Sequence, residues 1–342
     1  MADRLAGLER PTSMRGRPLR IPFAGLLCIL ALMASCAPTF PGRRSPALPA
    51  PAPAASVQHE ARPVGCEGTA PPTAGVMTRQ IDVDDRMRTY LLAVPRSYSG
   101  TRPVPLVLNF HAYGSNAPQQ AAYSRLNELG SRRGFLVVTP EGSGSPARWT
   151  LPDTVPGVDE VAFVRGLLDE LRALWCIDEQ RLYATGMSNG AAFAALLACE
   201  LDGRIAAVAA VAGINIVEPC ESGAPVSIIA FHGTADTVVP YAGGRIFGSL
   251  EVRSVGEAVA EWAEHNRCAS DADEVRVSEN VLRRAYGGCA AGTAVHLYTV
   301  EGGGHTWPGA ANLPPLGPVT DEIEASQQVL DFFGEHPSPS AP

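Results

Sequence analysis

A serine with a glycine two positions to either side lies at Ser188, in the segment G-M-S-N-G. This spacing matches G-x-S-x-G, which places a nucleophilic serine on a sharp turn between a strand and a helix. A β-prone run precedes the serine at 182–185, and an alanine-rich run that favours a helix follows at 191–200. A side chain at Gly186 or Gly190 would collide with such a turn, so both positions require glycine. The pattern predicts that Ser188 is a nucleophile.

A serine nucleophile needs a base, and the base needs a group that orients it. When the serine stands on such a turn, the acid and then the histidine follow it along the chain. Asp236 follows an apolar run at 227–231, and His305 follows three glycines after a run at 295–300. Among the seven histidines, His305 has the position that a base requires, whereas His232 is expected to be structural. We therefore predict that Asp236 and His305 complete a catalytic triad with the serine.

The oxyanion of an acyl-transfer intermediate needs two backbone N–H donors. One is expected from the residue after the nucleophile, which is Asn189, and the other from the loop after the third strand. That loop is H-A-Y-G at 111–114, and Tyr113 is the candidate donor in it.

Apolar runs alternate with segments of helical periodicity along most of the chain. Strands are expected at 77–83, 87–94, 105–110, 135–139, 182–185, 205–211, 227–231 and 295–300, and helices at 117–129, 158–175, 191–200, 255–266 and 322–333. Strands that alternate with helices predict an α/β fold with a mostly parallel central sheet and helices on both faces. Ligand sites in such sheets lie at the carboxyl ends of the strands, where the candidate residues are found.

These residues resemble the esterase/poly(3-hydroxybutyrate) depolymerase family, which includes feruloyl and acetylxylan esterases. The matching segments are 109–114, 181–190, 232–241 and 303–309, within a similarity that covers about 65–333. The resemblance implies an α/β-hydrolase fold with Ser188, Asp236 and His305 as the triad. Two positions depart from the family pattern, because Ala112 and Ala191 stand where glycine is common.

The resemblance also bears on the substrate. It implies a carboxylic ester with a short acyl, hydroxycinnamoyl or hydroxyalkanoate group, including esters carried by a polysaccharide. Trp307 either lines the substrate cleft or packs so as to fix the histidine loop, and Tyr241 is a further candidate for lining the cleft. No metal and no other cofactor is expected.

Two other functions fit parts of the pattern. A serine peptidase of the prolyl-oligopeptidase kind shares the fold and the order of the triad, but nothing in this chain resembles its propeller domain. A non-catalytic envelope lipoprotein that binds polysaccharide would not need the intact serine, acid and histidine. Nucleic-acid binding is disfavoured, because the net charge is −8 and no basic cluster or repeat is present.

The first 35 residues have the features of an export signal. Three arginines (Arg15, Arg17 and Arg20) precede an apolar stretch at 21–33, which is short for a membrane span. The following M-A-S-C resembles a bacterial lipobox and predicts lipidation at Cys36; the alternative is a plain signal peptide cut nearby. Residues 36–64 form a linker rich in proline and alanine, residues 65–336 the catalytic domain, and 337–342 a tail. The chain is therefore expected to be exported, either as an envelope lipoprotein attached to a membrane or as an extracellular protein.

Cysteine usage agrees with export. Beyond Cys28 in the apolar stretch and Cys36, six of the eight cysteines remain, an even number that fits three disulfides in an oxidising compartment. Cys268 and Cys289 bracket a polar segment that we expect to be irregular, so we pair them. One of Cys176, Cys199 and Cys220 is expected to take Cys66.

Overall fold

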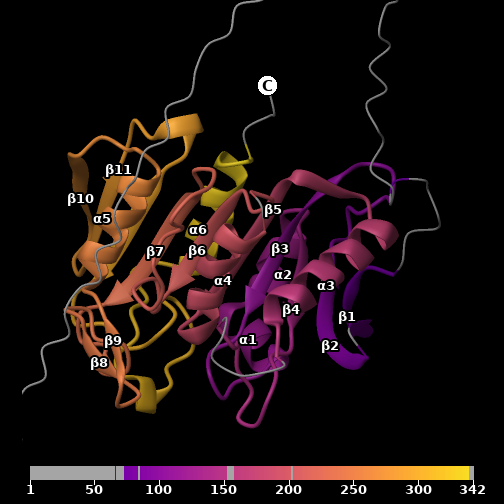
Figure 1. Cartoon of the computed structure of the whole chain (residues 1–342), viewed down its shortest axis with the longest axis horizontal. Coiled ribbons are helices and arrows are strands. Elements are labelled where there is room, and N and C mark those ends of the chain that lie inside the picture. Colours follow the sequence, from indigo (N-terminus) through magenta and orange to yellow (C-terminus); the bar gives the residue numbers. More distant parts are fainter. Residues whose placement is uncertain (1–65, 67–72, 84, 152–157, 202, 339–342) are drawn as a thin grey trace, which may run out of the picture. The chain divides into compact units, whose positions relative to one another are not determined.

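The computed structural model describes Cys66 and residues 73–338, except 84, 152–157 and 202 (Figure 1). The predicted signal, the linker and Cys36 lie outside the described residues. Within the described part, no helix is both long and apolar enough to cross a membrane.

The centre of the fold is a ten-stranded sheet formed by the described residues. Its six inner strands are mutually parallel and run in the order β4 (Leu136–Pro140), β3 (Val104–Phe110), β5 (Ile177–Met187), β6 (Ala207–Val211), β7 (Ser227–Gly233) and β12 (Val295–Val300). Antiparallel hairpins extend both edges: β1 (Gly75–Val83) with β2 (Arg86–Val94), and β10 (Ala272–Ser278) with β11 (Val281–Tyr286). The predicted mostly parallel sheet is confirmed.

The inner strands are apolar on both faces, as strands covered on both sides must be. In β3, Leu106, Leu108 and Phe110 point into one hydrophobic core, and Val107 points into the other. The first core is closed by α3 (Glu160–Leu174), α4 (Asn189–Glu200) and α5 (Val255–His265). The second is closed by α2 (Leu126–Arg132) and α6 (Ala325–Glu335), with α1 (Ala117–Ser124) beside α2. Helices therefore cover both faces, as predicted (Figure 1).

The smaller elements lie in the connections. Among them are the hairpin of β8 (Gly244–Ile246) and β9 (Leu250–Val252), and the 3-10 turns η2 (Ala290–Gly292) and η3 (Pro314–Leu316).

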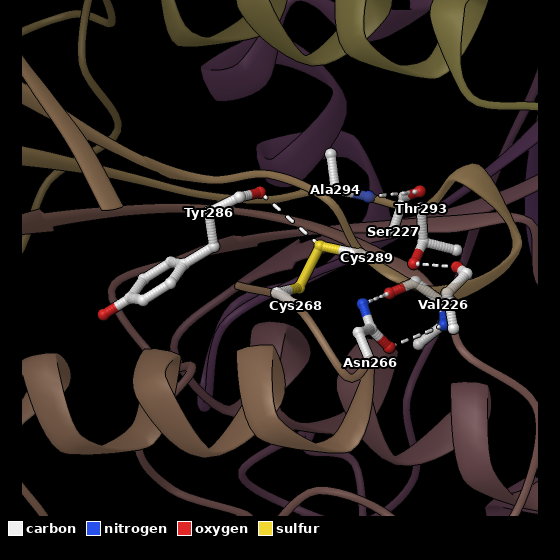
Figure 2. Close-up of a disulfide and its surroundings, with 9 residues drawn as sticks. Val226, Ser227, Asn266, Cys268, Tyr286, Cys289, Thr293 and Ala294 are labelled. Atoms are coloured by element: carbon white, nitrogen blue, oxygen red, sulfur yellow. Dashed lines mark hydrogen bonds between the residues drawn. A yellow bond between two sulfur atoms is a disulfide. The ribbon is translucent and has the colours of Figure 1, made fainter. Parts of the chain in front are cut away.

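Three disulfides join the six remaining cysteines: Cys66–Cys176, Cys199–Cys220 and Cys268–Cys289. The predicted pairing of Cys268 with Cys289 is confirmed, as is a partner for Cys66 within the predicted set. Figure 2 shows that Cys268–Cys289 ties the region after α5 to the chain between β11 and β12. The segment between these cysteines is not irregular, because it forms the β10–β11 hairpin that extends the sheet.

Candidate active site

Ser188 stands on a sharp turn between β5 and α4. Its backbone has φ 55° and ψ −120°, and it is the N-cap residue of α4, with a side chain that makes no capping hydrogen bond. A Cβ added to Gly186 would lie 2.5 Å from the Gly190 carbonyl, and one added to Gly190 would lie 2.4 Å from the Phe110 carbonyl oxygen. Both distances are far below contact distance, so the predicted need for two glycines is confirmed. The turn leaves the serine hydroxyl unused by the helix.

Asp236 and His305 meet at the carboxyl ends of two adjacent strands. β7 pairs with β12 in parallel, with Val300 opposite Gly233, so the loops that follow these strands start side by side. His305 Nδ1 lies 2.7 Å from Asp236 Oδ2, and both residues are buried. The structure therefore joins two residues that the sequence places 69 positions apart.

Asp236 is surrounded by donors on both of its oxygens. The backbone N–H groups of Val238 and Val239 donate to Oδ1 at 2.8 Å each. His232 Nε2 lies 3.2 Å from Oδ2 and 2.8 Å from the Val239 carbonyl oxygen. His232 thus makes the structural contacts expected of it, and it also orients the carboxylate.

These surroundings fix the charge of Asp236. Burial raises the pKa of its carboxyl, but the hydrogen bonds from His232, His305 and the Val239 backbone outweigh burial and hold the pKa well below its usual range. Asp236 is therefore a carboxylate that accepts the Nδ1–H of His305, which leaves Nε2 of that imidazole as the proton acceptor.

Ser188 and His305 line one cavity of about 600 Å³. Most other side chains that line it are apolar: Ala112, Tyr113, Ala122, Tyr123, Met187, Val238, Phe247, Ala311, Leu313 and Leu316. Among the described residues, no aspartate, glutamate or arginine lines the cavity. No group of three histidine, cysteine or acidic residues in the described part of the chain could hold a metal ion.

The two segments expected to supply oxyanion donors touch each other. Asn189 is the first residue of α4, and Tyr113 lies in the loop after β3, where its side chain lines the cavity. The Cα of Gly190 packs so closely on this loop that an added Cβ would lie 2.5 Å from the His111 carbonyl oxygen.

A second connection between these segments runs through Trp149. Its backbone N–H donates to Asn189 Oδ1 at 2.7 Å, and Asn189 Nδ2 donates to its carbonyl oxygen at 2.9 Å. The Trp149 indole N–H donates to the His111 carbonyl oxygen at 3.0 Å. Sequence reasoning did not find this network, because 40 residues separate Asn189 from Trp149 and no motif links them.

His111 contributes to the same network. Its Nδ1 lies 2.8 Å from the Ala112 carbonyl oxygen, and its Nε2 accepts the Gly142 N–H at 2.9 Å. Burial lowers the pKa of His111, so the ring is neutral and both nitrogens are committed to backbone groups.

Of the two alternatives for Trp307 the structure favours packing, and the proposed cleft-lining role of Tyr241 needs correction. Trp307 is buried, and its indole N–H donates to Ser326 Oγ at 3.0 Å, so it packs behind the histidine loop. The Tyr241 hydroxyl lies 2.8 Å from Thr299 Oγ1, and neither aromatic residue lines the cavity. The aromatic side chains that do line it are Tyr113, Tyr123 and Phe247, of which sequence reasoning singled out the first alone.

The parallel sheet, the strained serine turn and the buried Asp–His pair at neighbouring strand ends define an α/β hydrolase. Residues 88–283 match the family described as esterase PHB depolymerase. The chain belongs to this family, as its motifs predicted.

Individual relatives agree with this assignment. A putative esterase, NocK of Nocardia uniformis subsp. tsuyamanensis, is 32% identical over 337 residues, which are 90% of this chain and 96% of that protein. Feruloyl esterase B of Piromyces equi is 29% identical over 229 residues, 64% of this chain, and the match spans 42% of that longer relative. An acetyl xylan esterase from Aspergillus awamori has the same fold, with a TM-score of 0.56 and 15% identity over 76% of this chain and 99% of that one. The acetyl xylan esterase supports the fold alone, whereas the family and the two curated relatives support a carboxylic-ester hydrolase.

Proposed function

We propose that this protein is an exported serine esterase in which Ser188 is the nucleophile, His305 the general base and Asp236 the residue that orients the base. The observation that carries the proposal is the 2.7 Å hydrogen bond between Asp236 and His305, beside a cavity that His305 lines together with Ser188. Export is supported by the sequence of the first 35 residues and by the three disulfides.

The proposed reaction has two halves. His305 Nε2 takes the proton of Ser188 Oγ as the oxygen attacks the ester carbonyl carbon, and the backbone N–H groups of Asn189 and Tyr113 stabilise the oxyanion. The imidazolium then gives its proton to the leaving alkoxide, and an acyl group remains on the serine. A water molecule, deprotonated by the same histidine, releases the acid and restores the serine. Asp236 stays ionised throughout and stabilises the imidazolium.

The substrates proposed are short acyl, hydroxycinnamoyl or hydroxyalkanoate esters, including esters attached to a polysaccharide. Two relatives carry the names feruloyl esterase and bifunctional acetylxylan esterase/xylanase, which supports this range. The cavity supports an uncharged substrate, because no acidic residue and no arginine of the described chain lines it.

Variants of the triad test the mechanism. Ser188→Ala and His305→Ala should each lower kcat by a factor on the order of 10⁴ or more, and Asp236→Asn somewhat less, because triad members act as a unit. A fluorophosphonate probe should label the wild type at Ser188, and the exposed Ser99→Ala variant serves as the matched control. Near-normal turnover by Ser188→Ala would end the serine-esterase proposal.

An ester series tests the substrate range. We expect hydrolysis of p-nitrophenyl acetate and methyl ferulate and little hydrolysis of p-nitrophenyl palmitate, since the relatives that support the substrate range are named for feruloyl and acetyl esters. The measurement is kcat/KM for the three esters. A preference for palmitate would overturn the substrate range and leave the triad untouched.

A further inference from the structure

The mouth of the cavity is surrounded by large apolar side chains that remain exposed to solvent. Tyr113 is 47% exposed, Val238 36%, Phe247 65% and Leu313 42%, and all four line the cavity. They come from four separate loops. Their common position at the cavity therefore does not result from the exposure of a single loop. Exposed apolar side chains that gather around one cavity indicate a binding surface.

Phe247 occupies a backbone position that disfavours it. It follows β8 in the turn of the β8–β9 hairpin with φ 48°, and Gly248 follows with φ 80°. Glycine or asparagine suits such a position, whereas a bulky side chain there is a genuine outlier. The aromatic ring is therefore present against the local preference of the backbone, which points to a role for the ring itself.

The base of the hairpin is firmly held. Ile246 and Val252 pack with Val239 in a small hydrophobic cluster of their own. Asn215 Nδ2 donates to the Arg253 carbonyl oxygen at 2.9 Å directly after β9. Figure 1 shows the hairpin beside the carboxyl end of β7, the strand that Asp236 follows. A fixed base of this kind presents the ring of Phe247 at a defined place.

Phe247 and Tyr113 together form an aromatic surface. Their ring centroids are 5.9 Å apart, with an angle of 39° between the planes. This separation is within the range of interacting aromatic pairs, so a third ring can contact both.

The chemistry around this surface favours an apolar ring over a sugar. A bound sugar presents hydroxyl groups that need hydrogen-bond partners. Among the polar side chains that line the cavity are Ser115 and Gln119, and the Ser115 hydroxyl donates to Gln119 Oε1 at 3.0 Å. This bond uses the Ser115 proton and the Gln119 oxygen within the pair, whereas the rings of Tyr113 and Phe247 are exposed and offer an apolar surface.

We propose that Tyr113 and Phe247 form a ring-binding site at the cavity mouth that selects esters carrying an apolar planar ring in either the acyl or the alcohol part. The proposal rests on the esterase function proposed above and adds to it the residues that choose the substrate. Aromatic pairing of this kind is expected to favour the aromatic substrate by about three- to ten-fold.

Matched pairs of esters test the site. In the acyl arm, methyl 3-phenylpropanoate is compared with methyl 3-cyclohexylpropanoate, and in the alcohol arm, benzyl acetate with cyclohexylmethyl acetate. The measured quantity is the ratio of kcat/KM for the aromatic over the saturated ester. Phe247→Ala and Phe247→Leu should lower this ratio about three- to ten-fold in at least one arm, and the affected arm identifies the part of the substrate that carries the ring. Leu250→Ala is the control, because Leu250 is 41% exposed on the same hairpin but does not line the cavity.

Unchanged ratios in both Phe247 variants would overturn the ring-binding site, as would an equal loss in Leu250→Ala. Failure of the esterase proposal has a different signature, in which the wild type neither hydrolyses p-nitrophenyl acetate nor is labelled at Ser188. A readout without turnover comes from Ser188→Ala, whose affinity for methyl 3-phenylpropanoate is measured by calorimetry. Adding Phe247→Leu should weaken this binding by the same factor, and unchanged affinity counts against the site.

Discussion

At the scale of single residues, the hydrogen bonds that orient Asp236 in the site also make the stability of the fold depend on pH. Its pKa is lowered in the folded protein, so below about pH 4 the unfolded chain binds a proton that the folded chain does not. The contribution of Asp236 to stability is therefore complete above that pH and is lost as the pH falls toward the lower folded pKa. Asp236→Asn should make the free energy of unfolding fall less steeply between pH 4 and pH 2.

Urea unfolding at several pH values measures the slope of the free energy of unfolding against pH. Asp82→Asn is the matched control, because Asp82 is exposed on β1 and is expected to leave the slope nearly unchanged. Equal slopes in the wild type and Asp236→Asn would contradict the assigned hydrogen bonds.

Asn189 has two distinct duties in the proposed mechanism. Its backbone N–H is a proposed oxyanion donor, whereas its carboxamide holds Trp149, which in turn holds the loop of the other donor through the His111 carbonyl. Asn189→Ala keeps the backbone N–H but releases Trp149. We expect kcat to fall on the order of 10²-fold with little change in KM, because small displacements of catalytic groups have effects of this size.

The affinity for a short alkylboronic acid, which forms a tetrahedral adduct with serine, should fall in parallel with kcat. Asn266→Ala is a closely matched control. The carboxamide of Asn266 makes the same two-bond contact with the Val226 backbone, at 3.0 and 2.6 Å, away from the cavity (Figure 2). Asn266→Ala should lower the free energy of unfolding but leave the affinity for the boronic acid unchanged. If Asn266→Ala lost as much boronic-acid affinity as Asn189→Ala, the positioning role of the Asn189 carboxamide would be refuted.

At the scale of elements, two glycines near helix starts differ in how closely another segment approaches them. An added Cβ at Gly190 meets the carbonyl oxygens of Phe110 and His111 at the end of β3, whereas one at Gly256 in the first turn of α5 meets nothing within 4 Å. Gly190→Ala should destabilise the fold by more than about 2 kcal/mol. Gly256→Ala should stabilise it by about 0.5 kcal/mol, because alanine restricts the unfolded chain. Denaturant unfolding of both variants provides the comparison, and equal effects would contradict it.

Two disulfides provide an internal comparison of a different kind. Cys199–Cys220 and Cys268–Cys289 each close a segment with a sequence separation of 21. If restriction of the unfolded chain dominates, replacing either pair by serines should cost about 3 kcal/mol, and the two losses should be similar. Thermal unfolding of both double variants measures the losses. A loss confined to one pair would assign the stabilisation to local packing instead.

At the scale of the whole molecule, the residues that sequence reasoning found are those whose positions follow from chain topology. Parallel strands end at one edge of a sheet, so Asp236 and His305 could be placed near the serine turn from the apolar runs together with the order of the triad along the chain. The orientation of a side chain does not follow from topology. Trp307 adjoins the histidine loop as its motif suggests, but the hydrogen bond to Ser326 turns its indole into the core.

Short elements were missed for a related reason. The strands β8 and β9 have three residues each and lie in a segment where no alternation can be recognised. Phe247, which their hairpin carries, was therefore not predicted to be near the cavity. The Asn189–Trp149 contact could not be predicted either, because no motif in the sequence around one residue indicates a contact with the other.

The location of the protein depends on residues outside the described part of the chain. Lipidation at Cys36 would attach the mature protein to a membrane, with the proline-rich segment 36–64 between the lipid and the catalytic domain. When the full chain is expressed in a bacterium that processes lipoproteins, we expect the protein to partition into detergent, and its N-terminal peptide should carry the mass of a lipid on Cys36. Cys36→Ser should abolish both signals. Cys28→Ser is the matched control, because Cys28 lies inside the apolar stretch of the predicted signal and is not the proposed lipid site. A lipid-free N-terminus mapped elsewhere would instead identify a plain signal peptide and a released enzyme, with the proposed catalytic mechanism unaffected.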